Sequence, residues 1–524
     1  MKKKILSIVM TLALLAGSVS CGIIAYAESG KVKFALGTDL HIENTRTELS
    51  VDYPESELYF NAGGSGNLYD QAATLAKTFL RNSTREGVDF ILIAGDFTRG
   101  GTREQHEYVA DLLANHEKKT GTPVYVVPGN HDYYNSNPEE FKEIYASLGY
   151  DEALTVDSKT ASYTADLPGD YRLIAVDSNT VGEDGDSVDT RLLKWIKTQA
   201  EAAAKDGKRI IYMMHHPLLE HLPLGKVLMK DFMLRNSDLI AEMFCKWGIE
   251  YVFTGHEHGN DIASYKGLNG KTVYDVLTTS LSSYPTEYRM VTMDKTGADI
   301  EMRSIDKCDL SALVPGYTSA QKKMLKNDFN GFACGMFRYS TERKILKYVS
   351  PEFIKGKLKV SGGPLADEID ALFGAVGEAL TMPIYESDGG AKSMEALAAL
   401  KGVSLPETDY GSLIELVSAL VAAHYYGNEN LPAPENPEAE LVVKCLNTGL
   451  EYVLTKTGRT GIALLASVLT QLGVETDTLS PLFTAVKFGK EDSYKVAAAV
   501  LNPLLNRFLV DFSCPDRDTR LAAN

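Results

Sequence analysis

Short runs of apolar, mostly β-branched residues alternate with longer amphipathic stretches over the first half of the chain. Runs of four or five such residues are typical of strands buried on both faces of a sheet. The clearest are Val32–Leu36, Phe90–Ala94, Val124–Val127, Leu173–Val176, Ile210–Met214, Tyr251–Thr254 and Val273–Leu277. Between the first two, residues 68–85 place apolar side chains at helical spacing. Strands that alternate with helices predict an α/β domain, here over residues 31–306.

The pattern changes near residue 310, where we expect the strands to stop. The remainder is rich in Ala and Leu, with Gly and Pro between stretches of helical periodicity. These stretches are Leu365–Leu380, Ser393–Lys401, Ser412–Tyr426, Pro437–Thr457, Ile462–Leu472 and Tyr494–Phe508. The pattern therefore predicts an all-α C-terminal domain over residues 310–524.

Residues 1–27 have the layout of a secretory signal peptide. Three lysines, Lys2 to Lys4, precede the apolar stretch Ile5–Ala16, and Ala25-Tyr26-Ala27 is a small-x-small cleavage site. We expect cleavage after Ala27, secretion, and no membrane-spanning segment in the mature chain. If the signal peptide stays uncleaved, its residues 5–27 are long enough to span a membrane and tether the protein there.

Composition and charge narrow the function classes. The chain has 524 residues, 44% of them hydrophobic and 23% charged, which are ordinary globular values. Its net charge of −17 offers no basic surface for nucleic acid, so we expect no nucleic-acid partner. The acidic charge does not exclude an anionic substrate, because bound cations reverse the field locally.

Polar residues directly follow five of the predicted strands. The five patches are Asp39-Leu40-His41, Gly95-Asp96, Gly129-Asn130-His131-Asp132, His215-His216-Pro217 and Gly255-His256-Glu257-His258. In open α/β sheets, sites form outside the carboxyl ends of the strands. One such patch alone is weak evidence, but six of the ten histidines lie in these five. We therefore expect the patches to meet in one site.

The residue types in this predicted site favour two metal ions. The candidate ligands are Asp39, His41, Asp96, Asn130, His215, His256 and His258. Carboxylate and amide oxygens mixed with imidazoles suit Mn, Fe or Zn. Seven ligands are too many for one tetrahedral zinc, but they suit two metals that share a carboxylate. Asp96, in the middle of the chain order and after a glycine, is the expected bridge.

In this order, the motifs D-x-H, G-D, G-N-H-D, H-x-P and G-H-x-H resemble those of the calcineurin-like metallophosphoesterases. The resemblance covers residues 31–306 and implies a four-layer α-β-β-α sandwich with a dinuclear metal site. It implies that one metal takes Asp39, His41, Asp96 and His258, and the other Asp96, Asn130, His215 and His256. It further implies attack by a metal-bridging hydroxide, with Asn130 and His131 contacting the phosphate and His131 protonating the leaving group.

Three more residues are candidates for the substrate side of this site. Arg99 stands where plant-type purple acid phosphatases have a tyrosine ligand and the Ser/Thr protein phosphatases have an aspartate that orients the catalytic histidine. Arg99 could instead bind a substrate phosphate. What orients His131 stays open, with the neighbouring Asp132 as a candidate catalytic residue. His216, next to the expected ligand His215, could line the site.

The expected activity is hydrolysis of small phosphodiesters. The H-H-P form of the fourth motif resembles the cyclic-nucleotide and glycerophosphodiester branch of the family. A phosphomonoesterase is one alternative. Another is a non-catalytic protein whose helical domain binds a cell-wall or surface partner. The physiological substrate, the metal identities and the oligomeric state are left open.

Overall fold

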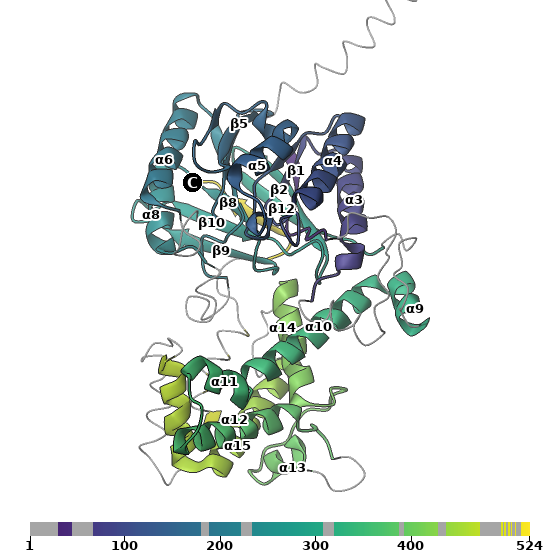
Figure 1. The fold of residues 1–524 in the computed structure, drawn as a ribbon, viewed down its shortest axis with the longest axis vertical. Coiled ribbons are helices and arrows are strands. Elements are labelled where there is room, and N and C mark those ends of the chain that lie inside the picture. Colours follow the sequence, from purple (N-terminus) through teal and green to yellow (C-terminus); the bar gives the residue numbers. More distant parts are fainter. Residues whose placement is uncertain are drawn as a thin grey trace, which may run out of the picture.

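The protein consists of a two-sheet sandwich, in the upper part of Figure 1, and a group of helices below it. This computed structural model describes residues 30–43, 66–179, 188–221, 233–307, 319–386, 392–427, 436–471 and 515–524, with isolated positions between 494 and 509. The predicted signal peptide lies outside the described residues. No helix within them is both long and apolar enough to cross a membrane.

Two mixed sheets form the sandwich. The first has the strand order β13-β12-β11-β1-β2-β3, and the second β4-β5-β6-β7-β8-β10-β9. The first sheet consists of β1 (Val32–Gly37), β2 (Phe90–Ile93), β3 (Val124–Val126), β11 (Glu287–Asp294), β12 (Gly297–Ser304) and β13 (Thr519–Ala522). The second consists of β4 (Thr155–Val156), β5 (Tyr163–Leu167), β6 (Tyr171–Val176), β7 (Arg209–Met214), β8 (Tyr251–Thr254), β9 (Asp261–Lys266) and β10 (Thr272–Leu277). The strands β1, β2 and β3 are parallel, as are β6, β7, β8 and β10.

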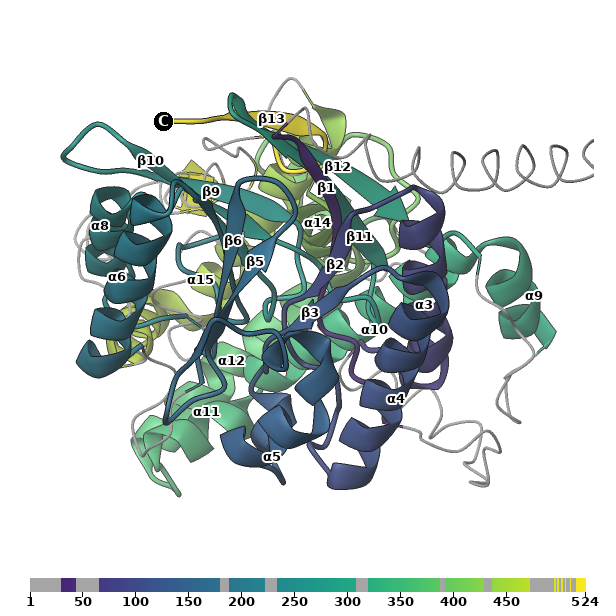
Figure 2. The same cartoon turned by 90° about the horizontal axis from the view of Figure 1, so that it is seen from above.

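Each sheet buries both of its faces, which explains the continuous apolar runs. In β2, Phe90 lies between the two sheets, whereas Ile91 points to the helices outside. The Phe34 ring stacks on Phe90 at 5.0 Å and meets Phe253 of the second sheet edge-on at 5.3 Å. Within the described part of residues 31–306, the helices on the outer faces (Figure 2) are α3 (Tyr69–Arg85), α4 (Arg103–Thr120), α5 (Pro138–Ile144), α6 (Thr190–Lys205) and α8 (Ser237–Trp247). The four-layer α-β-β-α prediction is therefore confirmed.

Most helices of the second part pack around a core of their own, which includes Leu372 and Leu416. The helices of this part are α9 (Ser319–Asn327), α10 (Phe329–Tyr348), α11 (Pro351–Leu358), α12 (Pro364–Thr381), α13 (Met394–Ala399), α14 (Leu413–Tyr426) and α15 (Pro437–Gln471). The first two instead bury Leu325 and Phe332 in the core outside the first sheet. The sequence pattern missed the first three. It split the last into two helices, and α15 is indeed interrupted at Gly458, where φ is 65°.

The expectation that strands stop near residue 310 is wrong. The strand β13 returns to the first sheet and pairs antiparallel with β12, so that Ile300 faces Thr519 and Gly297 faces Ala522. Leu521 is buried in the core between the sheets. The helical part is thus inserted between two adjacent strands of the sandwich rather than appended after it.

Candidate metal centre

The five predicted patches lie where β1, β2, β3, β7 and β8 end. Backbone hydrogen bonds join their loops, since Asp39 N donates to Gly95 O (2.9 Å) and His41 N donates to Asp96 O (2.9 Å). Gly255 N donates to His215 O, also at 2.9 Å. Residues far apart in the sequence are therefore held within one small volume.

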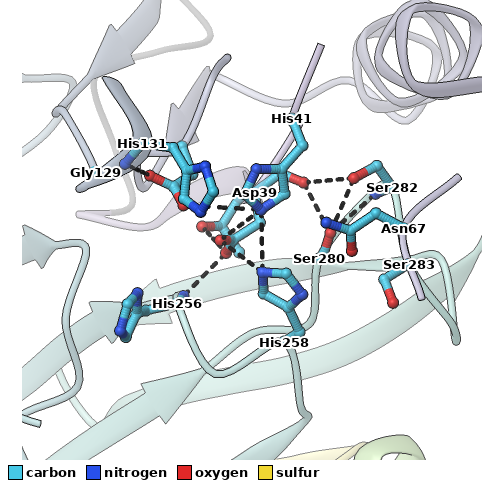
Figure 3. A network of polar contacts seen from close by, with 12 residues as sticks. Asp39, His41, Asn67, Gly129, His131, His256, His258, Ser280, Ser282 and Ser283 are labelled. Atoms are coloured by element: carbon cyan, nitrogen blue, oxygen red, sulfur yellow. Dashed lines mark hydrogen bonds and ion pairs between the residues drawn. The ribbon is translucent and has the colours of Figure 1, made fainter. Parts of the chain in front are cut away.

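Asp39, His41 and His258 form one candidate ligand group (Figure 3). The Nε2 atoms of the two histidines are 3.1 Å apart. Asp39 Oδ1 lies 3.2 Å from His258 Nε2 and 3.6 Å from His41 Nε2. These three residues belong to the set expected for the first metal.

Asp96, His215 and His256 form a second candidate group. Asp96 Oδ2 lies 3.5 Å from His215 Nε2, and His256 Nδ1 lies 3.2 Å from His215 Nε2. Asp96 Oδ2 is also 3.7 Å from His41 Nε2 of the first group. A third combination, His41, Asp96 and His131, overlaps both. Asp96 thus lies between the two groups, where a bridging carboxylate is expected.

The donor set fits a pair of cations. Among the described residues, Asp39 Oδ1 and Asn130 Oδ1 are buried and accept no hydrogen bond. His215 donates Nδ1–H to Ala94 O (2.7 Å), which leaves the lone pair of its Nε2 to face the carboxylates. Buried oxygen and imidazole lone pairs that face one another are costly unless a cation or a proton lies between them.

Without a metal, protons have to stabilise these carboxylates. Burial lowers the pKa of His215, but Asp96 and Asp39 outweigh burial and raise that pKa to about 10. Burial raises the pKa of Asp39, yet His258 and His215 bring it well below its usual value. Burial and the charge of His215 lower the pKa of His256 to about 3. A cation that binds these side chains therefore has to displace a proton from His215.

Backbone geometry is unusual at five of the expected ligands. Positive φ angles, which are uncommon for residues other than glycine, occur at Asp39 (54°), His41 (45°), Asp96 (53°), His256 (75°) and His258 (62°). The glycines of the motifs allow the loops to approach closely. A Cβ atom on Gly129 would lie 2.2 Å from Asp96 Oδ1, and one on Gly255 would lie 2.6 Å from Asp39 Oδ2.

His131 lies beside the first group, with its ring centroid 4.8 Å from that of His41. Its backbone N–H donates to Asp96 Oδ1 (2.9 Å), and its Nδ1–H donates to Arg99 O (2.8 Å). The Tyr134 ring packs against it at 4.5 Å. A backbone carbonyl therefore orients the imidazole and directs Nε2 away from Arg99.

The suggestion that Asp132 orients His131 is not what the structure shows. The Asp132 carboxylate is buried and accepts the N–H groups of Phe97 (3.2 Å), Thr98 (3.1 Å) and Gly129 (2.9 Å). It joins the loop after β2 to the loop after β3. Asp132 is thus a positioning residue for both loops.

The other two substrate-side candidates also have structural partners. The guanidinium of Arg99 forms an ion pair with Glu43 (2.6 Å) and lies 4.2 Å from the centre of the Tyr69 ring. His216 is fully buried, pairs through Nδ1 with Ser178 Oγ (2.8 Å) and packs on His256 at 4.4 Å. This placement favours support of His256 over the predicted contact of His216 with substrate.

Sequence reasoning missed a group of hydroxyl side chains behind Asp39. Thr38 Oγ1 donates to Asp39 Oδ2 (2.7 Å), and Ser280 Oγ and Ser282 Oγ donate to its carbonyl (2.8 and 3.2 Å). Both serines follow β10, so the strand-end rule that identified the ligands could have found them (Figure 3).

Fold and site together define an α/β sandwich with a binding site suited to two metals. Residues 32–260 match the family model of the Calcineurin-like phosphoesterase. This part of the chain is therefore similar to that family.

Relatives of the chain include two probable phosphodiesterases. A probable glycerophosphodiester phosphodiesterase from Arcobacter nitrofigilis is 25% identical over 169 residues, which are 30% of this chain and 56% of that protein. A probable cyclic nucleotide phosphodiesterase from Xenorhabdus bovienii is 23% identical over 221 residues, or 42% of this chain and 76% of that protein. Among solved structures, a dimetal phosphatase from Danio rerio is similar over 52% of this chain and 96% of that chain, with 12% identity and a TM-score of 0.39.

Proposed function

We propose that the protein is a metal-dependent phosphoesterase that hydrolyses small phosphodiesters. The position of Asp96, within reach of imidazoles from both candidate ligand groups, is the observation that supports this most directly. The names of the glycerophosphodiester and cyclic nucleotide relatives favour diesters over monoesters.

Each part of the site has a distinct role in this reaction. The two candidate ligand groups would hold a metal pair, which would neutralise charge on the phosphate and lower the pKa of a bound water. His131 holds its Nδ1 proton in the hydrogen bond to Arg99 O, so Nε2 is the atom that can give a proton to the leaving oxygen. Asp132 keeps the loop of His131 against the loop of Asp96 through its three backbone hydrogen bonds.

A substrate comparison tests the proposed class. We expect the purified, metal-loaded protein to hydrolyse bis(p-nitrophenyl) phosphate with a higher kcat/KM than p-nitrophenyl phosphate. Preference for the monoester would identify a phosphomonoesterase and reject the diesterase proposal. Hydrolysis of neither ester, nor of glycerophosphodiesters or cyclic nucleotides, would favour the non-catalytic alternative.

His131→Ala tests the proton donor. General acid catalysis typically contributes about 10²–10⁴-fold to the rate, and we expect a loss of that order for a diester with an alkyl leaving group. The loss of rate should be much smaller for bis(p-nitrophenyl) phosphate, because its leaving group, p-nitrophenolate, needs no protonation. His116→Ala, which removes a histidine on α4 outside the site, is the matched control. Equal losses for both leaving groups would reject the proton-donor role.

We further propose that the protein is secreted. The support is the sequence alone, namely the lysines before Ile5–Ala16 and the small-x-small site that ends at Ala27. N-terminal sequencing of protein recovered from the culture medium should begin at Glu28. Recovery of only the full-length chain in the membrane fraction would favour the tethered alternative.

A further inference from the structure

The C-terminal end of α14 touches the loop that contains His256 and His258. Asn260 N–H donates to Tyr425 O (3.1 Å), which joins this loop directly to the helix. The helix ends at Gly427, where φ is 76° and an added Cβ atom would lie only 2.9 Å from Asn260 O. Figure 1 shows α14 reaching from the helical part to the lower side of the sandwich.

Asn260 connects this contact to His258. Its Oδ1 accepts Thr279 N–H (3.1 Å), and Thr279 Oγ1 in turn donates to His258 O (2.5 Å). Its Nδ2 donates to Glu287 Oε2 (3.0 Å). A short chain of hydrogen bonds, buried at Asn260, therefore runs from α14 to the backbone of a candidate metal ligand.

Arg517 lies between the helical part and β13 in the sequence, and it contacts both Glu287 and the end of α14. Its guanidinium forms a two-pronged ion pair with Glu287, with Nη1–Oε2 at 2.7 Å and Nη2–Oε1 at 2.9 Å. The same Nη1 donates to Tyr426 O (2.7 Å), and the guanidinium lies 3.7 Å from the centre of the Tyr426 ring. Glu287 is only 1% exposed, so water cannot substitute for the arginine.

We propose that Arg517, acting through Glu287 and Asn260, is a positioning residue for the His258 loop, and that the helical part is thereby a component of the metal centre. This rests on the proposed metal-dependent function. His256 and His258 both have positive φ, and a backbone of that kind persists only where its surroundings hold it. The segment from Gly255 to Asn260 is held to α14 by the Asn260–Tyr425 hydrogen bond and to Arg517 through Asn260 and Glu287.

The measurable consequence is weaker metal binding when Arg517 is changed. Partners that orient metal ligands typically account for a factor of about 10–100 in metal affinity. We expect Arg517→Gln to lose cobalt affinity by a factor in this range. Because the hydrogen-bond chain ends at His258, the loss should be confined to one of the two ions.

The experiment uses the full chain, stripped of metal with a chelator and titrated with Co²⁺. Equilibrium dialysis gives the number of ions bound at each free concentration, and the visible absorption of Co²⁺ reports ligand geometry. Arg520→Gln is the matched control, because this arginine lies three residues further along and its guanidinium contacts Asp294, Thr296 and Asp299, none of which is buried. Wild-type affinity and spectrum in Arg517→Gln would overturn the proposal, even if its melting temperature fell.

Arg517→Lys covers the case in which Arg517→Gln does not fold. Lysine keeps the charge but not the two-pronged geometry or the stacking on Tyr426. We expect it to fold, as judged by circular dichroism, and to bind the ion held by His258 with an affinity between those of wild type and Arg517→Gln. If Arg517→Gln does not fold, wild-type cobalt binding by Arg517→Lys would reject the positioning role. If both variants fold, wild-type binding by both would reject it. Cobalt binding needs no substrate, so a wild-type protein that binds two ions and hydrolyses no ester would refute the proposed function alone.

Discussion

At the scale of single residues, the site combines costly backbone geometry with very close packing. Non-glycine residues in sparsely populated φ regions cost about 1–3 kcal/mol each. Five expected ligands have positive φ, so the surrounding loops have to stabilise conformations that the isolated peptides would avoid. The glycines of the motifs make this possible, because they leave space for ligand atoms on the neighbouring loop.

Gly129→Ala tests this close packing. The added methyl group would lie 2.2 Å from Asp96 Oδ1 and 2.5 Å from Asp96 N, so the two loops have to move apart. We expect Gly129→Ala to lose both bound ions. Its kcat/KM should fall by at least about 10²-fold, since a misplacement of 1 Å can reduce the rate by that factor. Metal content by mass spectrometry and kcat/KM measure the effect.

Gly374→Ala on α12 is the control for Gly129→Ala. No atom lies within 4 Å of the position that its Cβ would occupy, so metal content and activity should match wild type. Full metal occupancy in Gly129→Ala would show that the loops tolerate separation.

The sequence predicted which side chains come together better than it predicted their supports. Asp39 and Asp96 follow neighbouring apolar strands of the first sheet, and His215 follows an apolar strand of the second. Side chains at the carboxyl ends of such strands are expected to line a site. By contrast, the partner of the His131 ring is the carbonyl of Arg99, and every residue has a carbonyl. No residue type marks such a partner in a sequence.

At the scale of elements, buried ion pairs fix the loops after the central strands of the second sheet. His221 lies between two carboxylates, with Nδ1 2.5 Å from Asp261 Oδ2 and Nε2 3.0 Å from Asp275 Oδ2. Asp275 Oδ2 also accepts the N–H groups of Leu218 and Leu219. The loop after β7 is thereby held to β9 and β10, behind the metal ligands.

The charge of His221 predicts how the stability of the metal-free protein depends on pH. Burial lowers the pKa of His221, but Asp275 and Asp261 outweigh it and raise the pKa well above its usual value. The folded state then keeps a proton that the unfolded state releases near pH 6.5. Its contribution is complete below that pH and falls by about 1.4 kcal/mol per unit as the pH rises toward the folded pKa.

We expect His221→Gln to reduce the loss of melting temperature between pH 7 and pH 9. His116→Gln should keep the wild-type slope, because burial lowers the pKa of His116 and this group is neutral throughout that range. Thermal melts of chelator-treated protein provide the comparison. An unchanged slope in His221→Gln would mean that the folded protein holds His221 neutral.

Strands differed in how visible they were in the sequence. The seven predicted strands are confirmed, and they include the parallel strands at the centre of each sheet, whose faces are both buried. The missed strands lie in antiparallel pairings. In β12, the exposed Glu301 lies between the buried Ile300 and Met302, so no continuous apolar run marks the strand.

At the scale of the whole molecule, the sandwich is discontinuous in sequence. The strands β1 to β12 lie within residues 31–306, and β13 completes the edge beside β12 after the helical insertion. A strand of four residues has too little pattern to be recognised, and its partner is more than 200 positions away. Tertiary pairing alone defines β13.

Leu521→Ala tests whether β13 is an integral strand. Leu521 is 3% exposed in the core between the sheets, and truncation of such a leucine typically costs about 2–5 kcal/mol. We expect a loss of that size in urea unfolding monitored by circular dichroism. Arg520→Gln, on the opposite face of the same strand, should change the free energy of unfolding by less than about 0.5 kcal/mol. Similar values for both variants would show that β13 is only loosely attached.

The position of β13 also affects the order of events on the ribosome. The edge of β12 has no partner until residues 519–522 have been synthesised, although β1 to β12 are complete by residue 304. At about 5–20 residues per second, the nascent chain carries this open edge for roughly 10–40 s. Open edges are templates for pairing with other chains, so newly made protein should depend on chaperones during that interval more than the finished protein does.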